Sequence, residues 1–218
     1  MFFRKKDDQR AMSSADVVSM VKSRIHVPEA QKQVPLNEDE ITFLLDTWSQ
    51  LETNPRVLEV GMGWGFSASC LIAAGSVDHT IVSYETGDQD VVRESIALRN
   101  IQQFGRPRVI FGSSAVVLPR LVYEGERFGL VLIDGNHTFD YTLIDAFYAI
   151  KLLVVGGVFL IDDLVYPQIK SVCDFLEKNI AQVKLVARPP NAALFQKISD
   201  VDERDNCLHF VPFQTHWP

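Results

Sequence analysis

Short apolar runs alternate with segments of helical periodicity through most of the chain, from residue 56 to residue 179. The apolar runs predict strands, and the longer segments between them, where apolar residues recur every three or four positions, predict helices. We expect strands near 56–60, 80–84, 107–111, 128–133 and 157–161, and helices near 66–74, 88–103, 114–122, 138–154 and 166–179. Regular alternation of strand and helix is typical of a mainly parallel sheet with helices on both faces. The pattern therefore predicts an α/β fold.

Further elements flank this alternating region. Residues 15–34 predict a short helix followed by an irregular stretch, and a second helix begins at Asn37, with Glu40 completing a capping-box-like start. Val183–Ala187 and residues 192–198 predict two more strands, which we expect to close the sheet as an antiparallel hairpin. The expected architecture is a Rossmann-like, mainly parallel, seven-stranded sheet.

One predicted helix carries a clear apolar stripe. Within residues 138–154, Leu143, Phe147, Ile150 and Val154 recur at helical spacing. We interpret this stripe as the face of the helix that packs in the core.

The composition indicates a single domain. The chain has 218 residues, 47% of them hydrophobic, which is enough to bury one substantial core, and no linker-like stretch divides it. We expect an N-terminal helical extension over residues 1–52, a core over 53–198 and a C-terminal tail over 199–218. The tail is acidic and then aromatic, with Phe213 and Trp217 near its end, so it docks either on its own domain or on another subunit of a homo-oligomer.

Charge and apolar content limit the class of partner. The formal net charge is −7, which argues against the basic stripe of a nucleic-acid-binding surface. The N-terminus turns charged at Arg4 without a signal-peptide pattern, and the longest apolar run, 152–161, is too short to cross a bilayer. Cys70, Cys173 and Cys207 form neither a disulfide framework nor a metal spacing. We therefore expect a cytoplasmic protein that acts on a small molecule, without nucleic-acid or membrane partners.

The first predicted strand runs into a glycine-rich segment, Arg56-Val-Leu-Glu-Val-Gly-Met-Gly-Trp-Gly65. Gly61, Gly63 and Gly65 lack a Cβ atom, so the chain can turn sharply and a ligand can approach the main chain closely. The first N–H groups of the next helix face the same crevice. Strand, loop and helix together are typical of the start of a nucleotide-binding α/β fold. The alternative is a glycine-rich turn that only packs a helix onto the sheet.

The glycine spacing distinguishes two classes of nucleotide. Dinucleotide-binding folds have G-x-G-x-x-G, whereas here the third glycine comes one position early and Phe66 stands where a small residue is expected. An NAD(P)-binding oxidoreductase or epimerase is therefore disfavoured but stays an alternative. The segment Glu59-x-Gly-x-Gly-x-Gly65 instead resembles the first motif of class I S-adenosylmethionine-dependent methyltransferases. This resemblance implies S-adenosylmethionine as the cofactor, with Glu59 and the three glycines at its binding site.

Two further segments are candidates for contacts to the nucleoside. Glu85 ends the second predicted strand, where a carboxylate can accept hydrogen bonds from both hydroxyls of a ribose. Its alternative is a solvated loop acid. Ser113 and Ser114 follow the third strand, at the position that resembles the adenine-binding site, and either serine could equally cap the next helix.

Acidic residues follow two other predicted strands. Asp134 and His137 come after the strand at 128–133, and Asp162 and Asp163 come after the next one. Because the carboxyl ends of parallel strands meet at one edge of the sheet, we expect these side chains to converge there. Converging carboxylates repel one another unless a cation lies among them, and oxygen ligands suit Mg²⁺.

This part of the chain resembles the metal-dependent small-molecule O-methyltransferases, and in particular the branch that acts on sugars of macrolide antibiotics. The resemblance rests on Ile133-Asp-Gly-x-His137, a following helix with Asp145, the pair Gly156-Gly157, and a strand that ends in Asp162-Asp163. It implies that Asp134, Asp162 and Asp163 hold Mg²⁺, that Asp134 also belongs to the catalytic and cofactor-binding groups, and that His137 is the general base. The implied acceptor is a small-molecule hydroxyl. Catechol-type relatives carry Asp-Asn instead of Asp162-Asp163, so a catechol is not the expected acceptor.

Several alternatives remain open on the sequence alone. Asp162 or Asp163 could cap the helix that begins near Tyr166, Asp134 could contact only the cofactor, and His137 could be an ordinary loop histidine. Aminopropyl transfer is a related activity. A non-catalytic nucleoside-binding subunit with the same fold is the alternative from another class of protein.

Overall fold

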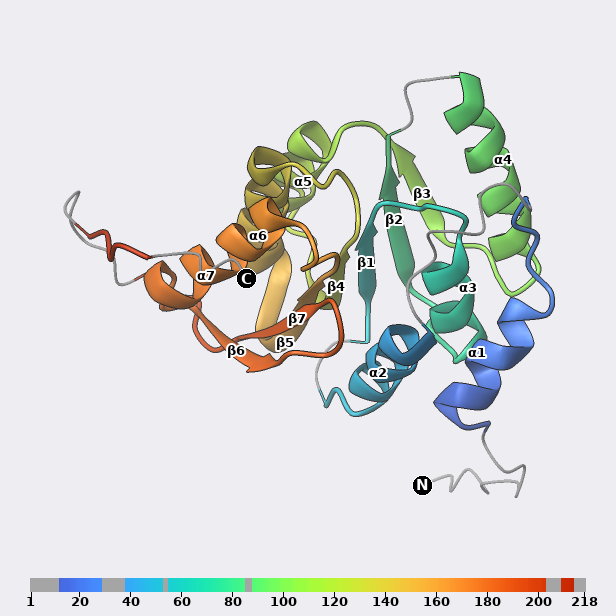
Figure 1. Ribbon diagram of the computed structural model, residues 1–218, viewed down its shortest axis with the longest axis horizontal. Helices are drawn as coiled ribbons and strands as arrows, with labels where there is room; N and C mark the ends of the chain where they lie inside the picture. Colours follow the sequence, from blue (N-terminus) through green and yellow to red (C-terminus); the bar gives the residue numbers. More distant parts are fainter. Residues whose placement is uncertain (1–11, 29–37, 53–54, 85–87, 203–208, 214–218) are drawn as a thin grey trace.

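The computed structural model describes residues 12–28, 38–52, 55–84, 88–202 and 209–213. Asn37, Glu85, Cys207 and Trp217 lie outside the described residues, so the helix start at Asn37 and the ribose contact of Glu85 stay predictions. The described residues form a seven-stranded sheet covered by helices on both faces (Figure 1). The predicted α/β class is confirmed.

Six of the seven strands in the described sheet run in the same direction, and β7 runs opposite to them. The strands are β1 (Val57–Val60), β2 (His79–Ser83), β3 (Arg108–Phe111), β4 (Phe128–Ile133), β5 (Leu153–Ile161), β6 (Val183–Ala187) and β7 (Ala193–Lys197). Their order across the sheet is β3-β2-β1-β4-β5-β7-β6, and β7 runs antiparallel to both of its neighbours. The predicted antiparallel hairpin is thus present, and its second strand is inserted between β5 and β6.

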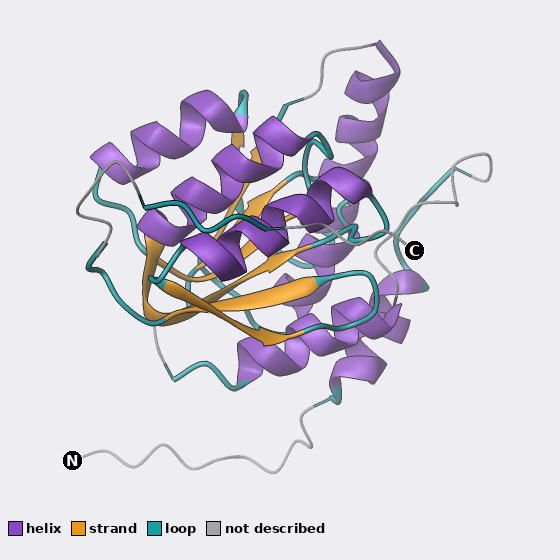
Figure 2. Ribbon diagram, turned by 60° about the vertical axis from the view of Figure 1, so that its left-hand side comes forward, coloured by secondary structure: helices purple, strands orange, loops and turns teal. Residues whose placement is uncertain are grey.

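The helices cover the sheet in two layers. They are α1 (Ser14–Lys22), α2 (Glu38–Ser49), α3 (Phe66–Ala73), α4 (Asp88–Gln102), α5 (Ser114–Tyr123), α6 (Phe139–Leu152) and α7 (Pro167–Asn179). Side chains of α5, α6 and α7 pack on one face, and those of α1, α2 and α3 pack on the other, with α4 beside α3 (Figure 1, Figure 2). Because both faces are covered, β1, β2 and β4 are buried along their whole length.

The boundary between α6 and β5 differs from the prediction. The helix ends at Leu152 and the strand begins at Leu153, so no loop separates them, although the sequence predicted a strand only from residue 157. Gly156 has φ +87°, and the β4–β5 pairing shifts register between Phe128 and Leu130. The glycine allows the strand to bend at an irregularity that no periodic pattern reveals.

The apolar stripe predicted on this helix is correct only in part. Leu143 and Ile150 contact the core, but Phe147 is 44% exposed and lies under the ammonium group of Lys151, 4.7 Å from its ring centroid. The buried face of α6 instead includes Asp145, which is 1% exposed. The buried face of α6 therefore differs from the predicted stripe, because it includes the polar residue Asp145 and leaves Phe147 at its margin.

The C-terminal tail docks on its own chain where it is described. The Asn179 side chain at the end of α7 donates to Val211 O at 3.0 Å and accepts from Val211 N–H at 2.7 Å. The ring of Phe213 lies 5.9 Å from that of Phe175 on α7.

Among the described helices, none combines the length and the apolar content needed to cross a membrane.

Candidate active site at the carboxyl ends of the parallel strands

The loop between β1 and α3 crosses the turn after β4 at very short distance. Gly61 has φ +98°, and a Cβ atom at this position would lie 1.9 Å from the carbonyl oxygen of Asp134. Main-chain hydrogen bonds fix both segments next to β1 and β2: Gly61 N–H donates to Val82 O of β2 at 2.9 Å, and Asp134 N–H donates to Val60 O of β1 at 2.9 Å. A glycine is therefore required at position 61, because the β1–α3 loop packs directly against the backbone of the turn after β4.

The other two glycines of the loop have different surroundings. Gly63 has φ +47° and nothing within 4 Å of its Cβ position, so it faces open space. Gly65 is the N-cap of α3, and a Cβ atom there would lie 2.7 Å from the side chain of Ile101 on α4. The packing interpretation of the motif thus holds for Gly65, whereas contact of Gly63 with a cofactor stays a prediction.

Glu59 is buried among protein partners. Its side chain is 1% exposed, one carboxylate oxygen accepts a hydrogen bond from Ser67 Oγ, and the other lies 2.9 Å from His79 Nε2. Ser67 belongs to α3 and His79 to β2, so the carboxylate joins the three elements that surround the glycine loop. Direct contact of Glu59 with a cofactor stays a prediction, and the geometry gives it a supporting role in the loop.

The nucleoside candidates lie at the carboxyl ends of β2 and β3. Ser83, Tyr84, Phe111 and Gly112 line a hollow there together with Glu94 of α4. Ser113 is the N-cap residue of α5 but its side chain makes no capping hydrogen bond, while Ser114 is buried. The helix-cap alternative for the Ser113 hydroxyl is therefore wrong, and its predicted adenine contact stays a prediction.

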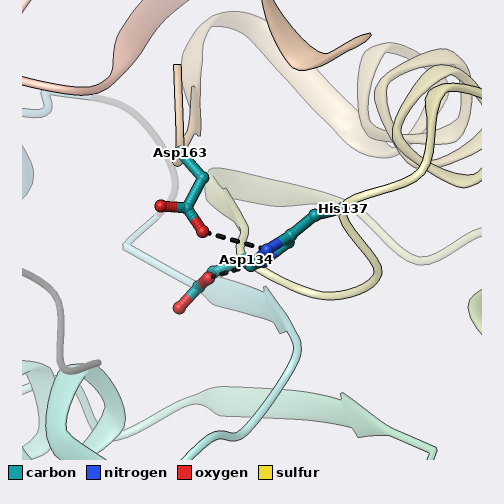
Figure 3. Close-up of side chains that lie close together, drawn as sticks. All are labelled: Asp134, His137 and Asp163. Carbon is teal, nitrogen blue, oxygen red and sulfur yellow. Dashed lines mark ion pairs between the residues drawn. The ribbon is translucent and has the colours of Figure 1, made fainter. Parts of the chain in front are cut away.

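Three of the predicted catalytic side chains meet beyond the ends of β4 and β5. His137 lies between two carboxylates: its Nδ1 is 3.1 Å from Asp163 Oδ2, and its Nε2 is 3.5 Å from Asp134 Oδ1 (Figure 3). Asp134 directly follows β4, His137 lies in the loop before α6, and Asp163 follows β5. The convergence predicted from the parallel sheet is observed for these three residues, and His137 is no ordinary loop histidine.

Neighbouring residues hold His137 in this position. The Gln168 side chain of α7 donates a hydrogen bond to His137 O at 2.7 Å, and the Tyr166 ring lies 5.5 Å from the imidazole. The neighbouring Asp134 carboxylate raises the pKa of His137, partial burial opposes this shift, and the charge of Asp163 adds to it. Burial raises the pKa of Asp134, and His137 opposes that shift. The pair therefore retains a proton more readily than either side chain would in water.

Asp162 lies apart from this group. It is 6% exposed, and its Oδ1 accepts a hydrogen bond from the backbone N–H of Asp163 at 2.6 Å. Burial, followed by the charge of Asp134, raises the pKa of Asp162 to about 8. The N-cap of α7 is Tyr166, without a side-chain capping bond, so the interpretation of Asp162 or Asp163 as a helix cap is wrong.

Asp145, which the sequence resemblance includes, is a further buried acid. It lies on the inner face of α6, and burial raises its pKa to about 6, with the Ser114 hydroxyl opposing the shift. Nothing in the described residues places Asp145 in the group around His137.

The group around His137 fits a divalent cation. One potential ligand atom from each of Asp134, His137 and Asp163 lies within 4.8 Å of the others. Two carboxylates and one imidazole are a suitable donor set for a divalent ion. Repulsion from neighbouring acids contributes to the raised pKa values of Asp134 and Asp162, and a cation would relieve it.

Sequence reasoning did not find two residues that shape the site. Gln168 donates a hydrogen bond to His137 O, and Asn191 contacts Asp163 from the loop between β6 and β7. The sequence signal for Asn191 was a turn, Pro189-Pro190-Asn191, which predicts a loop but not its position in the fold.

Comparison with known proteins agrees with this geometry. Residues 58–164 match the model of a family described as a methyltransferase domain. No curated protein sequence matches the chain.

Solved structures share the fold at low sequence identity. An SAH-bound methyltransferase from Podospora anserina has a TM-score of 0.61 at 14% identity, over 89% of this chain and 92% of its own. An O-methyltransferase from Bacillus cereus in complex with SAH has a TM-score of 0.56 at 16% identity, over 88% and 93%. A putative caffeoyl-CoA O-methyltransferase from Staphylococcus aureus has a TM-score of 0.58 at 13% identity, over 85% and 93%. Sheet order, glycine loop and the solved structures together show the class I methyltransferase fold, and residues 58–164 within it match a methyltransferase domain.

Proposed function

We propose that the protein transfers a methyl group from S-adenosylmethionine to a hydroxyl group of a small molecule, with a divalent cation at the acceptor. The observation that carries the proposal is the group of Asp134, His137 and Asp163 at the carboxyl ends of β4 and β5. It lies directly beside the glycine loop, because a Cβ atom on Gly61 would lie 1.9 Å from the Asp134 carbonyl oxygen. A proton acceptor and a cation site therefore adjoin the expected position of the methyl donor.

The cofactor half of the site would be built mainly from backbone. Gly63 leaves open space, the first turn of α3 presents N–H groups, and the Ser113 hydroxyl makes no capping bond. Glu85 is proposed to accept hydrogen bonds from the ribose. Glu59 would act through the loop that it supports.

His137 is proposed to accept the proton of the substrate hydroxyl. The contact between its Nδ1 and Asp163 favours the tautomer with the proton on Nδ1, which leaves Nε2 as the acceptor. Nε2 is buried and has no hydrogen bond in the described part of the chain. Its raised pKa makes His137 a stronger base than a histidine in water.

Asp134 and Asp163 are proposed to hold the cation. When bound, a divalent cation lowers the pKa of a hydroxyl that coordinates it. The family resemblance adds Asp162, whose Oδ1 accepts from the Asp163 N–H in the structure. Under this proposal Asp162 stabilises the turn after β5, and it becomes a ligand of the cation only if its carboxylate rotates away from the Asp163 N–H.

The charge balance of the reaction suits such a pocket. A sulfonium and an alkoxide carry opposite unit charges, and methyl transfer converts them into a neutral thioether and a neutral ether. A dry, preorganised site favours this loss of charge. Much of the remaining barrier is the alignment of oxygen, methyl carbon and sulfur, which binding both reactants supplies.

The acceptor class is supported by charge and by similar structures. The net charge of −7 disfavours a nucleic-acid substrate. Two of the similar structures are described as O-methyltransferases, one of them of the caffeoyl-CoA type. We therefore propose a small hydroxyl compound as the acceptor.

The experiment that tests this function is calorimetric titration with S-adenosylhomocysteine, with NAD⁺ as the control, followed by Mn²⁺ binding monitored by electron paramagnetic resonance. We expect S-adenosylhomocysteine to bind and NAD⁺ not to bind. Mn²⁺ should bind the wild type at one site and be lost in an Asp134→Asn/Asp163→Asn variant. Equal Mn²⁺ binding in that variant would contradict the cation site, and failure to bind S-adenosylhomocysteine would favour a non-catalytic protein.

A further inference from the structure

We propose that Asn191 is a positioning residue, which holds the Asp163 carboxylate against His137 from the loop between β6 and β7. This inference rests on the proposed function of the site. Asn191 lies beyond residues 58–164, the part of the chain that matches the methyltransferase family. The family match therefore says nothing about Asn191.

Three hydrogen bonds join Asn191 to the segment that follows β5. Asn191 O accepts from Leu164 N–H at 2.7 Å, and Asn191 Oδ1 accepts from Val165 N–H at 2.7 Å. The third bond runs from Asn191 Nδ2 to Asp163 Oδ1 at 3.1 Å. One residue thus binds two consecutive backbone N–H groups and the carboxylate that precedes them.

The third bond fixes the orientation of a side chain in the site. Asp163 Oδ1 accepts from Asn191, and Asp163 Oδ2 lies 3.1 Å from His137 Nδ1. The two oxygens of one carboxylate are therefore directed to opposite partners. Without the amide, the carboxylate could rotate about its χ2 angle, which is a soft torsion.

The backbone conformations of the two residues support the same conclusion. Asp163 has φ +64° and Asn191 has φ +59°, and they are the two residues other than glycine with positive φ in the described part of the chain. Such conformations persist where the surroundings over-determine them, and they occur often at functional sites. Here the two strained residues hydrogen-bond to each other, so each contributes to holding the other.

The competing explanation is that Asn191 only closes the hairpin loop onto the β5–α7 turn. The two roles use different atoms, because closure uses Asn191 O and Oδ1 whereas positioning uses Nδ2. Asn191→Asp keeps the oxygen that accepts from Val165 and tolerates positive φ, but it removes the donor to Asp163. Asn191→Gly tolerates the backbone conformation and removes both side-chain bonds. Pro190→Gly, next to Asn191 on the exposed loop, is the control for loop flexibility alone.

The first measurement is the tautomer of His137, read from long-range correlation of the two ring nitrogens with the ring protons. The chain has five histidines, and His137→Gln identifies the signal. At a fixed pH where the ring is neutral, the wild type and Pro190→Gly should show mainly the Nδ1–H form. Asn191→Asp, which also places a second carboxylate beside Asp163, and Asn191→Gly, which adds no charge, should both shift toward a mixture of tautomers. Unchanged ring nitrogen signals in both Asn191 variants would overturn the proposal.

The second measurement is Mn²⁺ affinity in Asn191→Gly. Loss of a group that orients a metal ligand typically weakens binding by about 10-fold or more, whereas affinity for S-adenosylhomocysteine should change by less than about twofold. Equal Mn²⁺ affinity in Asn191→Gly and wild type would overturn the positioning role. If the wild type binds no Mn²⁺, the cation part of the proposed function fails, and the tautomer measurement still decides the role of Asn191.

Discussion

The two halves of the site are built in different ways. On the proposed cofactor side, the loop between β1 and α3 relies on backbone and on the absence of side chains: Gly61 approaches Asp134, Gly65 approaches α4, and no protein atom lies near the Cβ position of Gly63. On the reacting side, β4 and β5 end in side chains that are oriented by hydrogen bonds from α7 and from the β6–β7 loop. The glycine loop is thus encoded by one short segment, whereas the orientation of the reacting side chains depends on segments far apart in the sequence.

Substitution of Gly61 should break both halves at once and have the largest effect. In Gly61→Ala, the new Cβ would meet the Asp134 carbonyl at 1.9 Å, with φ at +98°. We expect a loss of about 3 kcal/mol or more in the free energy of unfolding, because the contacted atom is backbone and cannot move aside.

Gly63→Ala is the matched control, since its Cβ position is open. It should lose about 1 kcal/mol through its positive φ and weaken the binding of S-adenosylhomocysteine. Urea denaturation and calorimetry measure both quantities. Equal stability of the two variants would contradict the separate roles of these glycines.

Substitution of His137 should affect only the reacting half. We expect His137→Ala to lower turnover by about 10²-fold or more, the usual contribution of a general base, with affinity for S-adenosylhomocysteine within about twofold of wild type. Steady-state kinetics with an acceptor found by screening, together with calorimetry, checks this. Turnover that survives the substitution would remove the assignment as base.

Asp145 tests whether the buried acid of α6 takes part in the reaction. Its pKa of about 6 in the folded protein lies above its value in the unfolded chain, so the folded state binds more protons between these values. Its contribution to stability is therefore fully present below about pH 4 and is lost as the pH rises through about 6. Asp145→Asn should gain roughly 2 kcal/mol relative to wild type at pH 7 and little at pH 4.

Chemical denaturation at the two pH values measures this difference. Turnover of Asp145→Asn should stay close to that of wild type if the acid is structural. A loss of turnover comparable to that of His137→Ala would instead place Asp145 in the reacting half.

Glu59 should show the smallest effect. Both carboxylate oxygens are engaged by Ser67 and His79, so Glu59→Gln would keep one acceptor and weaken the other contact. We expect a loss of about 1 kcal/mol in stability and less than about threefold in affinity for S-adenosylhomocysteine. A loss of affinity of tenfold or more at unchanged stability would show that Glu59 contacts the cofactor directly.

Much of the fold was predictable because its causes are local. The strands β1 and β4 are buried on both faces, and this produces the continuous apolar runs that predicted them. The error at the start of β5 arose where Gly156 lets the strand follow α6 without a loop. Phe147 was wrongly assigned to the core. An apolar stripe predicts which face of a helix is buried, but not how far the packing of adjacent elements extends to the margins of that face.

The sequence by itself determined the order of strands and helices, the glycine loop, and the meeting of Asp134, His137 and Asp163 at one edge of the sheet. These follow from hydrophobic periodicity and from the rule that parallel strands end together. Only the tertiary structure decided which of the adjacent acids faces His137, since Asp163 takes positive φ while Asp162 turns back to the Asp163 N–H. The physical reason is that Asp163 is held by Asn191, 28 residues away, and that contact exists only once β7 has paired with β5.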